Sequence, residues 1–326
     1  MSLLEIKGLE TEFQTEQGVV KALRGINYTV DRGEVLGIVG ESGSGKSVGM
    51  LSLMGLLAPN GTVTAGEMIF DGEDISPIKY KTKKEKKEYE KKMNQIRGND
   101  ISMIFQDPMS YLNPIVTIEK QMTEGIRFHT KCSKKEAVQR AVELMKMVGI
   151  PAPESRLKQY PFEFSGGMRQ RIIIAIALAC NPKLIVADEP TTALDVTVQA
   201  QILDLLKDIT RESNAGVIII THDLGVVASL CDRISIMYGG NIMEEGTTDE
   251  IFYDPKHPYT KGLLNSIANS NIDHREPLKP IPGTPPDLLK LGDQCPFASR
   301  CSEAMEICTK ASPLVTEFGE KHKCKC

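Results

Sequence analysis

The chain has 326 residues, a formal net charge of −4 and a hydrophobic share of 41%. This length can bury a large core and leaves room for one large domain with an appendage, while the nearly neutral charge does not suggest a nucleic-acid-binding protein. The longest purely apolar stretch, residues 172–180, has nine residues, and a membrane span needs about 20. The first residues lack the pattern of a secretory signal. We therefore expect a cytosolic protein with reduced thiols.

The hydrophobic pattern predicts an α/β fold. Alternating polar and apolar residues at 3–8 and 18–30, and again at 67–71, predict an antiparallel sheet. Continuous apolar runs predict buried strands of a mostly parallel sheet. These runs lie at Val35–Val39, Ile101–Phe105, Leu184–Ala187 and Val217–Thr221.

A glycine-rich loop follows the first of these buried strands. It reads Gly40-Glu-Ser-Gly-Ser-Gly-Lys46-Ser47, which is the phosphate-binding sequence G-x-x-x-x-G-K-[ST] between a predicted strand and a predicted helix at 48–57. Its glycines allow backbone N–H groups to converge on phosphate oxygens. Lys46 would reach the β- and γ-phosphates, and the Ser47 hydroxyl would bind Mg²⁺. The expected nucleotide-binding residues are Gly40, Ser42, Gly43, Ser44, Gly45, Lys46, Ser47 and Val48.

Polar side chains follow the other three predicted strands. Gln106 follows the second, Asp188 and Glu189 the third, and His222 the fourth. Ligands of open α/β sheets gather at the carboxyl ends of the strands. A carboxylate there can hold Mg²⁺, and the next one can act as general base toward the attacking water. His222 could hydrogen-bond the γ-phosphate, and Gln106 could complete the metal sphere.

Between the second and third strands, residues 108–182 have a helical pattern. Ser165 stands as the N-cap of a predicted helix at 168–180, and Gly166 and Gly167 open backbone N–H groups at its positive end. This is an anion site without an evident anion in its own chain, so it could serve a phosphate on another subunit. The lysine-rich run 79–92 is expected to be a solvated surface helix or loop, or else a contact with lipid head groups.

The order of these features along the chain resembles that in the ATP-binding subunits of ABC transporters. The features are the phosphate loop, Gln106, the Ser165-Gly-Gly sequence, the strand ending in Asp188-Glu189, Ala193-Leu194-Asp195 and His222. The resemblance implies a P-loop NTPase cassette with a RecA-like parallel core, an antiparallel β subdomain and a helical signature subdomain at about 107–182. It also implies a head-to-tail dimer, in which Ser165, Gly166 and Gly167 meet the partner's ATP and Asp195 touches the partner.

The same resemblance implies a role for each remaining residue. ATP and Mg²⁺ are the expected cofactors, and Ser47, Gln106 and Asp188 are the expected Mg²⁺ ligands. Glu189 would be the catalytic base, with His222 and Gln106 as further catalytic residues. An aromatic residue would stack on adenine, and Phe13 is the candidate. The sequence Phe164-Ser-Gly-Gly-Met168 departs from the common Leu-Ser-Gly-Gly-Gln but retains the phosphate-binding Ser-Gly-Gly.

A narrower resemblance covers nearly the whole chain. Residues 105–114, 165–171, 257–267 and 282–288 resemble the dipeptide and oligopeptide (and nickel) importer ATPases. This implies a peripheral protein at the cytoplasmic face of the membrane, paired with a homologous second ATPase and two permeases and supplied by an external peptide-binding protein. We place the ATP-binding domain at 1–254 and a cysteine-rich extension at 255–326, with a proline-rich connector at 277–286. Alternatives are a nickel or oligosaccharide importer, a soluble ABC ATPase in translation or DNA repair, and a redox sensor.

Five of the eight cysteines lie in the last 32 residues. In a reducing compartment such a cluster favours a metal site over disulfides, and four thiolates suit zinc or an iron–sulfur cluster. The spacings are wider than the short pairs of structural zinc sites, and the tail resembles that of importer ATPases believed to carry [4Fe–4S]. We expect such a cluster on Cys295, Cys301, Cys308 and Cys324, with Cys326 as the other choice for the fourth ligand. Zinc, disulfides and free thiols remain alternatives.

Overall fold

The computed structural model describes residues 2–191, 195–266 and 280–326. Ala193 and Leu194, and residues 277–279 of the predicted connector, lie outside this set. The chain forms two compact units. We call residues 30–35 and 80–219 the helical unit, and residues 2–29, 36–79 and 220–326 the phosphate-loop unit.

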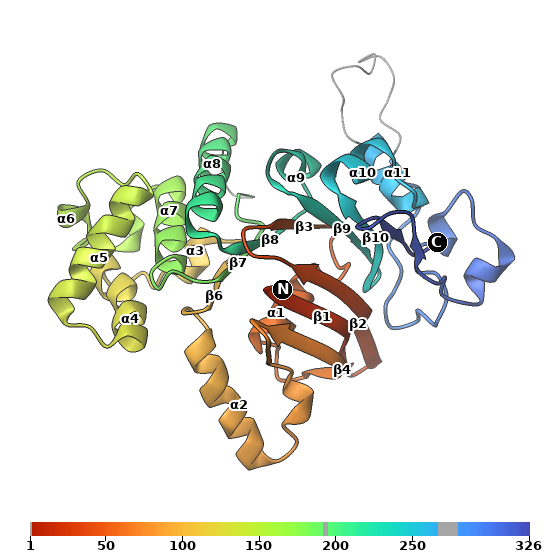
Figure 1. Cartoon of the computed structure of the whole chain (residues 1–326), viewed down its shortest axis with the longest axis horizontal. Helices are drawn as coiled ribbons and strands as arrows, with labels where there is room; N and C mark the ends of the chain where they lie inside the picture. The colour runs from red at the N-terminus through yellow and green to blue at the C-terminus, as the bar shows by residue number, and fades with distance from the viewer. Residues whose placement is uncertain (1, 192–194, 267–279) are drawn as a thin grey trace. The chain divides into compact units, whose positions relative to one another are not determined.

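The helical unit holds the parallel pair of strands β6 (Ile101–Ile104) and β7 (Leu184–Asp188) and a set of packed helices. Strand β6 pairs with β7 in the register Ile101 to Leu184. Figure 1 shows α4 to α7 grouped together. Three consecutive apolar residues of α7, Ile172, Ile173 and Ile174, are all buried. The helices are α2 (Lys83–Ile96), α3 (Pro108–Tyr111), α4 (Ile118–Thr130), α5 (Lys134–Met147), α6 (Pro153–Arg156), α7 (Gly166–Ala177) and α8 (Val196–Ser213).

Capping residues explain where two of these helices begin. Thr82 and Glu85 form a reciprocal capping box at α2, and Ser133 and Glu136 form one at α5. The lysine-rich run is therefore largely the helix α2, which buries Tyr89, Met93 and Ile96 along one side. This agrees with the solvated surface helix predicted from its charge.

The phosphate-loop unit contains an antiparallel sheet with the strand order β2-β1-β4-β5. A second group pairs β3 with β9 in parallel, and then β9, β10, β12 and β11 antiparallel to one another. The strands are β1 (Leu4–Thr15), β2 (Gly18–Val30), β3 (Val35–Val39), β4 (Gly61–Phe70), β5 (Glu73–Asp74), β9 (Arg233–Tyr238), β10 (Asn241–Thr247), β11 (Thr316–Glu317) and β12 (Lys323–Cys324).

Within the described residues, the same unit also contains α-helices. They are α1 (Lys46–Met54), α9 (Leu224–Leu230), α10 (Thr248–Tyr253) and α11 (Pro258–Asn265). Figure 1 shows α10 and α11 beside β10, close to the C-terminus. Strand β8 (Gly216–Thr221) is divided between the two units at residues 219 and 220.

The predicted strands are present within a few residues of their expected bounds, although β1 and β4 are longer than predicted. Helix α1 begins at Lys46 rather than 48, because Gly45 takes a left-handed conformation and ends the loop. Helix α7 begins at Gly166 because Ser165 accepts its capping hydrogen bond from the Met168 N–H. The domain division at residue 254 stays a prediction. Over the described parts of the chain, every helix is too short or too polar to span a bilayer.

Candidate functional site

The phosphate loop connects β3 to α1 and brings together all of its predicted residues. Lys46 is only 7% exposed, and its Nζ donates to the carbonyl oxygens of Gly40 at 2.7 Å and Glu41 at 2.9 Å. It also lies 3.4 Å from the Ser44 Oγ. These contacts hold the ammonium group against the loop backbone, while Ser42, Gly43 and Ser47 are exposed. The loop is therefore ordered around its lysine, with its polar groups open to a ligand.

Two glycines of this loop cannot carry a side chain. A Cβ on Gly40 would lie 2.0 Å from the carbonyl oxygen of Met237 on β9. Gly45 has a φ of +106°, and a Cβ there would lie 2.8 Å from the Ala22 carbonyl oxygen. The loop thus takes its shape by packing its backbone directly against neighbouring strands, which only glycine permits.

Within the helical unit, the predicted Mg²⁺ ligand Asp188 ends strand β7, and the predicted catalytic base Glu189 follows it. Asp188 is 9% exposed, and Glu189 takes a φ of +45°, the left-handed region that side chains rarely adopt. The Glu189 Oε2 accepts a hydrogen bond of 2.7 Å from the Gln106 Nε2. Strained residues of this kind cluster at functional sites. The geometry therefore brings Gln106 and Glu189 together, as their positions after β6 and β7 predict.

The Ser165-Gly166-Gly167 sequence, predicted to meet the ATP of a partner, stands at the start of α7, also in the helical unit. Ser165 and Gly166 are exposed, whereas a Cβ on Gly167 would lie 2.9 Å from the Val198 side chain of α8. The Gln170 Nε2 donates to the Pro190 carbonyl oxygen at 2.7 Å. Asp195 caps α8 by accepting from the Val198 N–H at 2.9 Å. The start of α7 is thus tied both to α8 and to the segment after Glu189.

His222 and Phe13 belong to the phosphate-loop unit. His222 is exposed directly after β8, and the next residue, Asp223, caps α9 by accepting from the Gly225 N–H at 2.8 Å. Phe13 is half-buried on β1 and packs on Gly61 of β4, where a Cβ would lie 2.7 Å from its ring. Neither arrangement tests the predicted roles of these two residues in catalysis and adenine stacking.

Four cysteines of the extension line one cavity of about 450 Å³: Cys295, Cys301, Cys308 and Cys326. Burial raises the pKa of Cys295, Cys301 and Cys326. His257 lines the same cavity. Its Nδ1 accepts from the Tyr259 N–H at 3.0 Å, and its buried Nε2 has no hydrogen-bond partner in the described structure.

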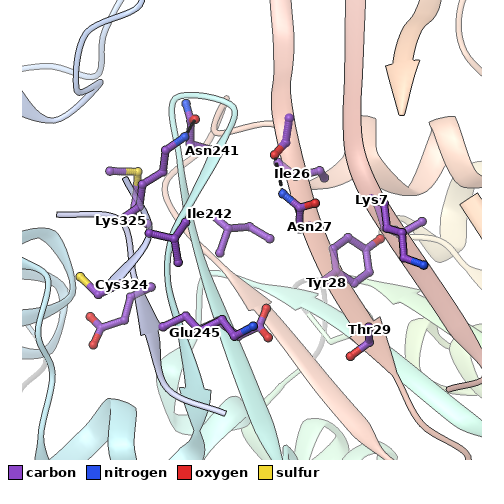
Figure 2. Close-up of a pocket in the computed structure, with 16 residues that line it drawn as sticks. Lys7, Ile26, Asn27, Tyr28, Thr29, Asn241, Ile242, Glu245, Cys324 and Lys325 are labelled. Atoms are coloured by element: carbon purple, nitrogen blue, oxygen red, sulfur yellow. Dashed lines mark hydrogen bonds between the residues drawn. The ribbon is translucent and has the colours of Figure 1, made fainter. Parts of the chain in front are cut away.

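Cys324, the fourth ligand expected from the sequence, is not among the residues that line this cavity. It is 2% exposed and lines a different pocket, of about 430 Å³, between β2, β10 and the end of the chain (Figure 2). Burial raises its pKa to about 12. In that pocket the Lys325 Nζ donates to the Asn241 Oδ1 at 2.8 Å. Across the described ranges, no group of three or more His, Cys, Asp or Glu side chains is arranged to hold a metal ion.

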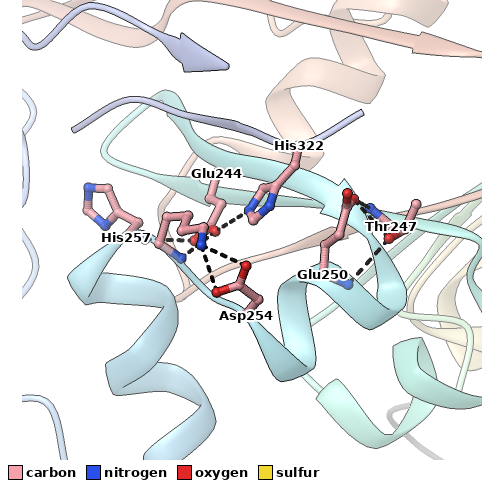
Figure 3. Close-up of polar contacts among 7 residues, drawn as sticks. Glu244, Thr247, Glu250, Asp254, His257 and His322 are labelled. Carbon is pink, nitrogen blue, oxygen red and sulfur yellow. Dashed lines mark hydrogen bonds and ion pairs between the residues drawn. The ribbon is translucent and has the colours of Figure 1, made fainter. Parts of the chain in front are cut away.

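A buried carboxylate connects the extension to β10. Glu244 is 0% exposed and accepts from the backbone N–H groups of Lys256 at 2.7 Å and His257 at 2.9 Å. The His322 Nε2 lies 2.8 Å from its Oε1 (Figure 3). Glu244 therefore fixes both the start of α11 and the chain that leads into β12. Sequence reasoning missed this residue because its partners are distant in the chain.

Comparison with known proteins gives two family matches. Residues 23–192 match the family described as "ABC transporter". Residues 243–308 match the one described as "Oligopeptide/dipeptide transporter, C-terminal region". The second match covers the segment that holds the first three cysteines of the cavity.

Curated relatives match along nearly the full chain. The oligopeptide transport ATP-binding protein OppD of Bacillus subtilis is 52% identical, over 99% of this chain and 88% of the relative. The dipeptide transport ATP-binding protein DppD of the same organism is 49% identical, over 99% and 94%. OppD of Salmonella typhimurium is 50% identical, over 96% and 90%.

Two solved structures share the fold. The ATP-binding cassette MJ0796, solved as a dimer bound to ADP and Pi, is 29% identical with a TM-score of 0.64, over 75% of this chain and 98% of that chain. The cbiO1 protein of Clostridium perfringens is 28% identical with a TM-score of 0.63, over 78% and 91%. These likenesses confirm the predicted cassette fold. The chain belongs to the ABC transporter family of ATP-binding proteins.

Proposed function

We propose that this chain is the ATP-hydrolysing subunit that powers a peptide importer. The observation that carries the proposal is full-length similarity to oligopeptide and dipeptide transport ATP-binding proteins, joined to a family match in the C-terminal region. The ordered phosphate loop and the hydrogen bond between Gln106 and Glu189 support the proposal, because such a subunit needs a phosphate site and a general base. A nickel or oligosaccharide importer, or a soluble ABC ATPase, is the alternative.

In the proposed reaction the phosphate loop binds the β- and γ-phosphates through its N–H groups and Lys46. Bound Mg²⁺ would neutralise charge on these phosphates, and Ser47, Gln106 and Asp188 offer the oxygen ligands that it prefers. Glu189 takes a proton from the water that attacks the γ-phosphate. Gln106 holds the Glu189 carboxylate through the hydrogen bond already formed. His222 would hydrogen-bond the γ-phosphate, and Phe13 would stack on adenine.

The exposed Ser165 and Gly166 at the start of α7 support a composite site with a second subunit. The solved MJ0796 cassette is a dimer. We infer a head-to-tail pair with a homologous ATPase, in which Ser165, Gly166 and Gly167 contact the partner's ATP and Asp195 contacts the partner. Two permeases would anchor the pair peripherally at the cytoplasmic face of the membrane, and an external binding protein would deliver peptide.

Reconstitution tests the transport proposal. The complex purified with its permeases is placed in vesicles with its binding protein and offered a panel of peptides, an oligosaccharide and nickel. ATP-dependent uptake of peptides alone supports the proposal. Uptake of nickel or sugar alone would contradict it, and so would co-purification with ribosomes or DNA in place of permeases.

We also propose a [4Fe–4S] cluster in the extension, with zinc as the alternative. Four cysteine sulfurs that could bind metal line one cavity. The buried Nε2 of His257, which has no partner in the described structure, could donate a hydrogen bond to a sulfide or thiolate there. Because Cys326 lines this cavity and Cys324 does not, we propose Cys295, Cys301, Cys308 and Cys326 as ligands. This replaces Cys324 with Cys326. The cluster would stabilise an extension too small to form its own core.

Purification without oxygen tests the cluster. Protein with a brown colour, absorbance near about 400 nm and about four irons per chain supports it. Colourless protein with one zinc per chain would contradict the cluster and leave the ATPase proposal intact.

A further inference from the structure

The phosphate loop carries an acidic side chain that contacts the extension. Glu41, the second residue of the loop, accepts a hydrogen bond through its Oε2 from the Arg300 Nη1 at 2.7 Å. The Glu41 N–H donates to the Tyr259 hydroxyl at 3.0 Å. Both the backbone and the side chain of Glu41 are therefore held by residues more than 200 positions away in the chain.

Arg300 is itself rigidly held. Its side chain is 5% exposed, and it donates to the Tyr238 hydroxyl at 3.0 Å, to the Pro282 carbonyl at 2.8 Å and to the Ile281 carbonyl at 3.3 Å. Its guanidinium lies over the rings of Tyr238 and Phe297, with 5.7 and 6.0 Å to their centroids. The guanidinium therefore presents one orientation to Glu41.

The charge of Glu41 makes this contact important for nucleotide binding. A carboxylate in a loop that binds a triphosphate repels its ligand, and that repulsion is strongest where water is partly excluded. A buried arginine at 2.7 Å offsets this charge and turns the carboxylate toward the extension. Without Arg300, the Glu41 carboxylate would leave an uncompensated negative charge in the phosphate loop.

We propose that Arg300 is a positioning residue of the nucleotide site, which neutralises Glu41 and holds it so that the phosphate loop can accept phosphate groups. This role rests on the ATP binding of the family and requires neither the proposed cargo nor the proposed cluster.

A charge-removal series tests the proposal. Mg-ATP affinity is measured on the full-length protein for R300Q, E41Q and the double variant E41Q/R300Q, with melting temperature recorded without nucleotide. R300Q should weaken ATP binding by on the order of 10-fold, the effect of one uncompensated charge at a partly screened site. E41Q should bind ATP at least as tightly as the unmodified protein, because it removes the repelling carboxylate and leaves the Arg300 charge in place. The double variant should recover to within about 3-fold, since no charge is left unpaired.

Arg24 provides the matched control. It also anchors the extension, by donating to the carbonyls of Leu288 at 3.4 Å, Leu291 at 2.7 Å and Gly292 at 3.0 Å, none of which belongs to the phosphate loop. R24Q should leave ATP affinity within about 3-fold. Equal losses in R24Q and R300Q would mean that any anchor of the extension suffices, and would overturn the proposal.

The double variant distinguishes charge compensation from simple support of the fold. If Arg300 only supported the extension, E41Q/R300Q would bind ATP as weakly as R300Q, and that result would overturn the proposal, as would unchanged binding in R300Q. If R300Q does not fold, R300K decides the question. R300K keeps the charge but loses the planar set of donors, so its loss of ATP affinity should be clearly smaller than about 10-fold, whereas a full 10-fold loss at an unchanged melting temperature would contradict charge compensation.

Discussion

The phosphate loop and the cysteine cavity belong to the same unit but are built in different ways. The loop takes its ligand-binding groups from eight consecutive residues, 40–47, and shapes them by close backbone packing on β9. The cavity gathers four cysteines spread over 32 positions, together with His257 from the start of α11. A contiguous site can be recognised as a motif, whereas a dispersed site depends on which side chains the fold turns inward. The following predictions test how far the two regions differ and whether they act independently.

The largest effect is expected at Glu189. Replacing it with glutamine keeps the hydrogen-bonding shape but removes the group that accepts a proton, so ATP turnover should fall at least about 10²-fold. ATP binding should persist, because Glu189 is not a group that holds the phosphates. The measurement is steady-state hydrolysis in the assembled complex beside nucleotide affinity. As a contrast, K46A should lose affinity itself, because it removes the charge opposite the phosphates. Turnover of E189Q within a few-fold of the unmodified protein would contradict the assignment.

The cavity is tested next by two cysteine substitutions. C326S should abolish most of the about four irons per chain in anaerobically purified protein, since it removes a proposed ligand. C324S removes a buried thiol that lines the other pocket and should retain the iron. Iron analysis and absorbance measure both variants, and melting temperature shows whether either one is misfolded. The reverse result, with iron lost only from C324S, would restore the ligand set expected from the sequence.

The backbone packing of the loop is tested by two alanine substitutions in the same segment. G40A would bring a Cβ to 2.0 Å from the Met237 carbonyl and should cost about 1–3 kcal/mol of unfolding free energy or more, with weakened ATP binding. G49A lies within α1, where a Cβ would have an ordinary contact of 3.8 Å. It should be neutral or stabilise by up to about 1 kcal/mol. If chemical denaturation shows that G40A and G49A lower the unfolding free energy equally, the close backbone contact at Gly40 is not the reason that glycine is needed there.

The smallest effect concerns the connection between the two regions. Phe297 lines the cysteine cavity and lies against Arg300, which holds Glu41. Removing iron with a chelator should therefore weaken ATP binding by about 2–5-fold, because the arginine becomes less firmly held. The measurement is Mg-ATP affinity before and after chelation, in the unmodified protein and in E41Q/R300Q. A loss of the same size in both proteins would show that the connection does not pass through Arg300 and Glu41.

Most elements of the fold could be predicted from the sequence. Continuous apolar runs predicted the buried strands, with β3 at its observed bounds, because a strand buried on both faces has no polar positions. Helix limits were less accurate. They depend on single residues such as Gly45, whose left-handed backbone ends the loop two residues earlier than the apolar pattern suggests.

Among the candidate site residues, the pairing of Gln106 with Glu189 followed from their places after two parallel strands. The choice between Cys324 and Cys326 could not be made in this way. Residues two apart share a face of a regular strand, but β12 ends at Cys324, so spacing alone does not say where the chain beyond it places Cys326. The roles of Glu244 and Arg300 were also missed, because their partners lie far away in sequence.

The sequence by itself determined where the candidate nucleotide-site residues lie, since local backbone geometry and strand order place the phosphate loop, Asp188 and Glu189 at the end of β7, and the Ser165-Gly-Gly cap. Only the tertiary structure decided which cysteines share a cavity and which cation faces Glu41. Those contacts join residues as far apart as 41 and 300. They exist because packing of the whole unit brings distant side chains together, a result that no short window of sequence encodes.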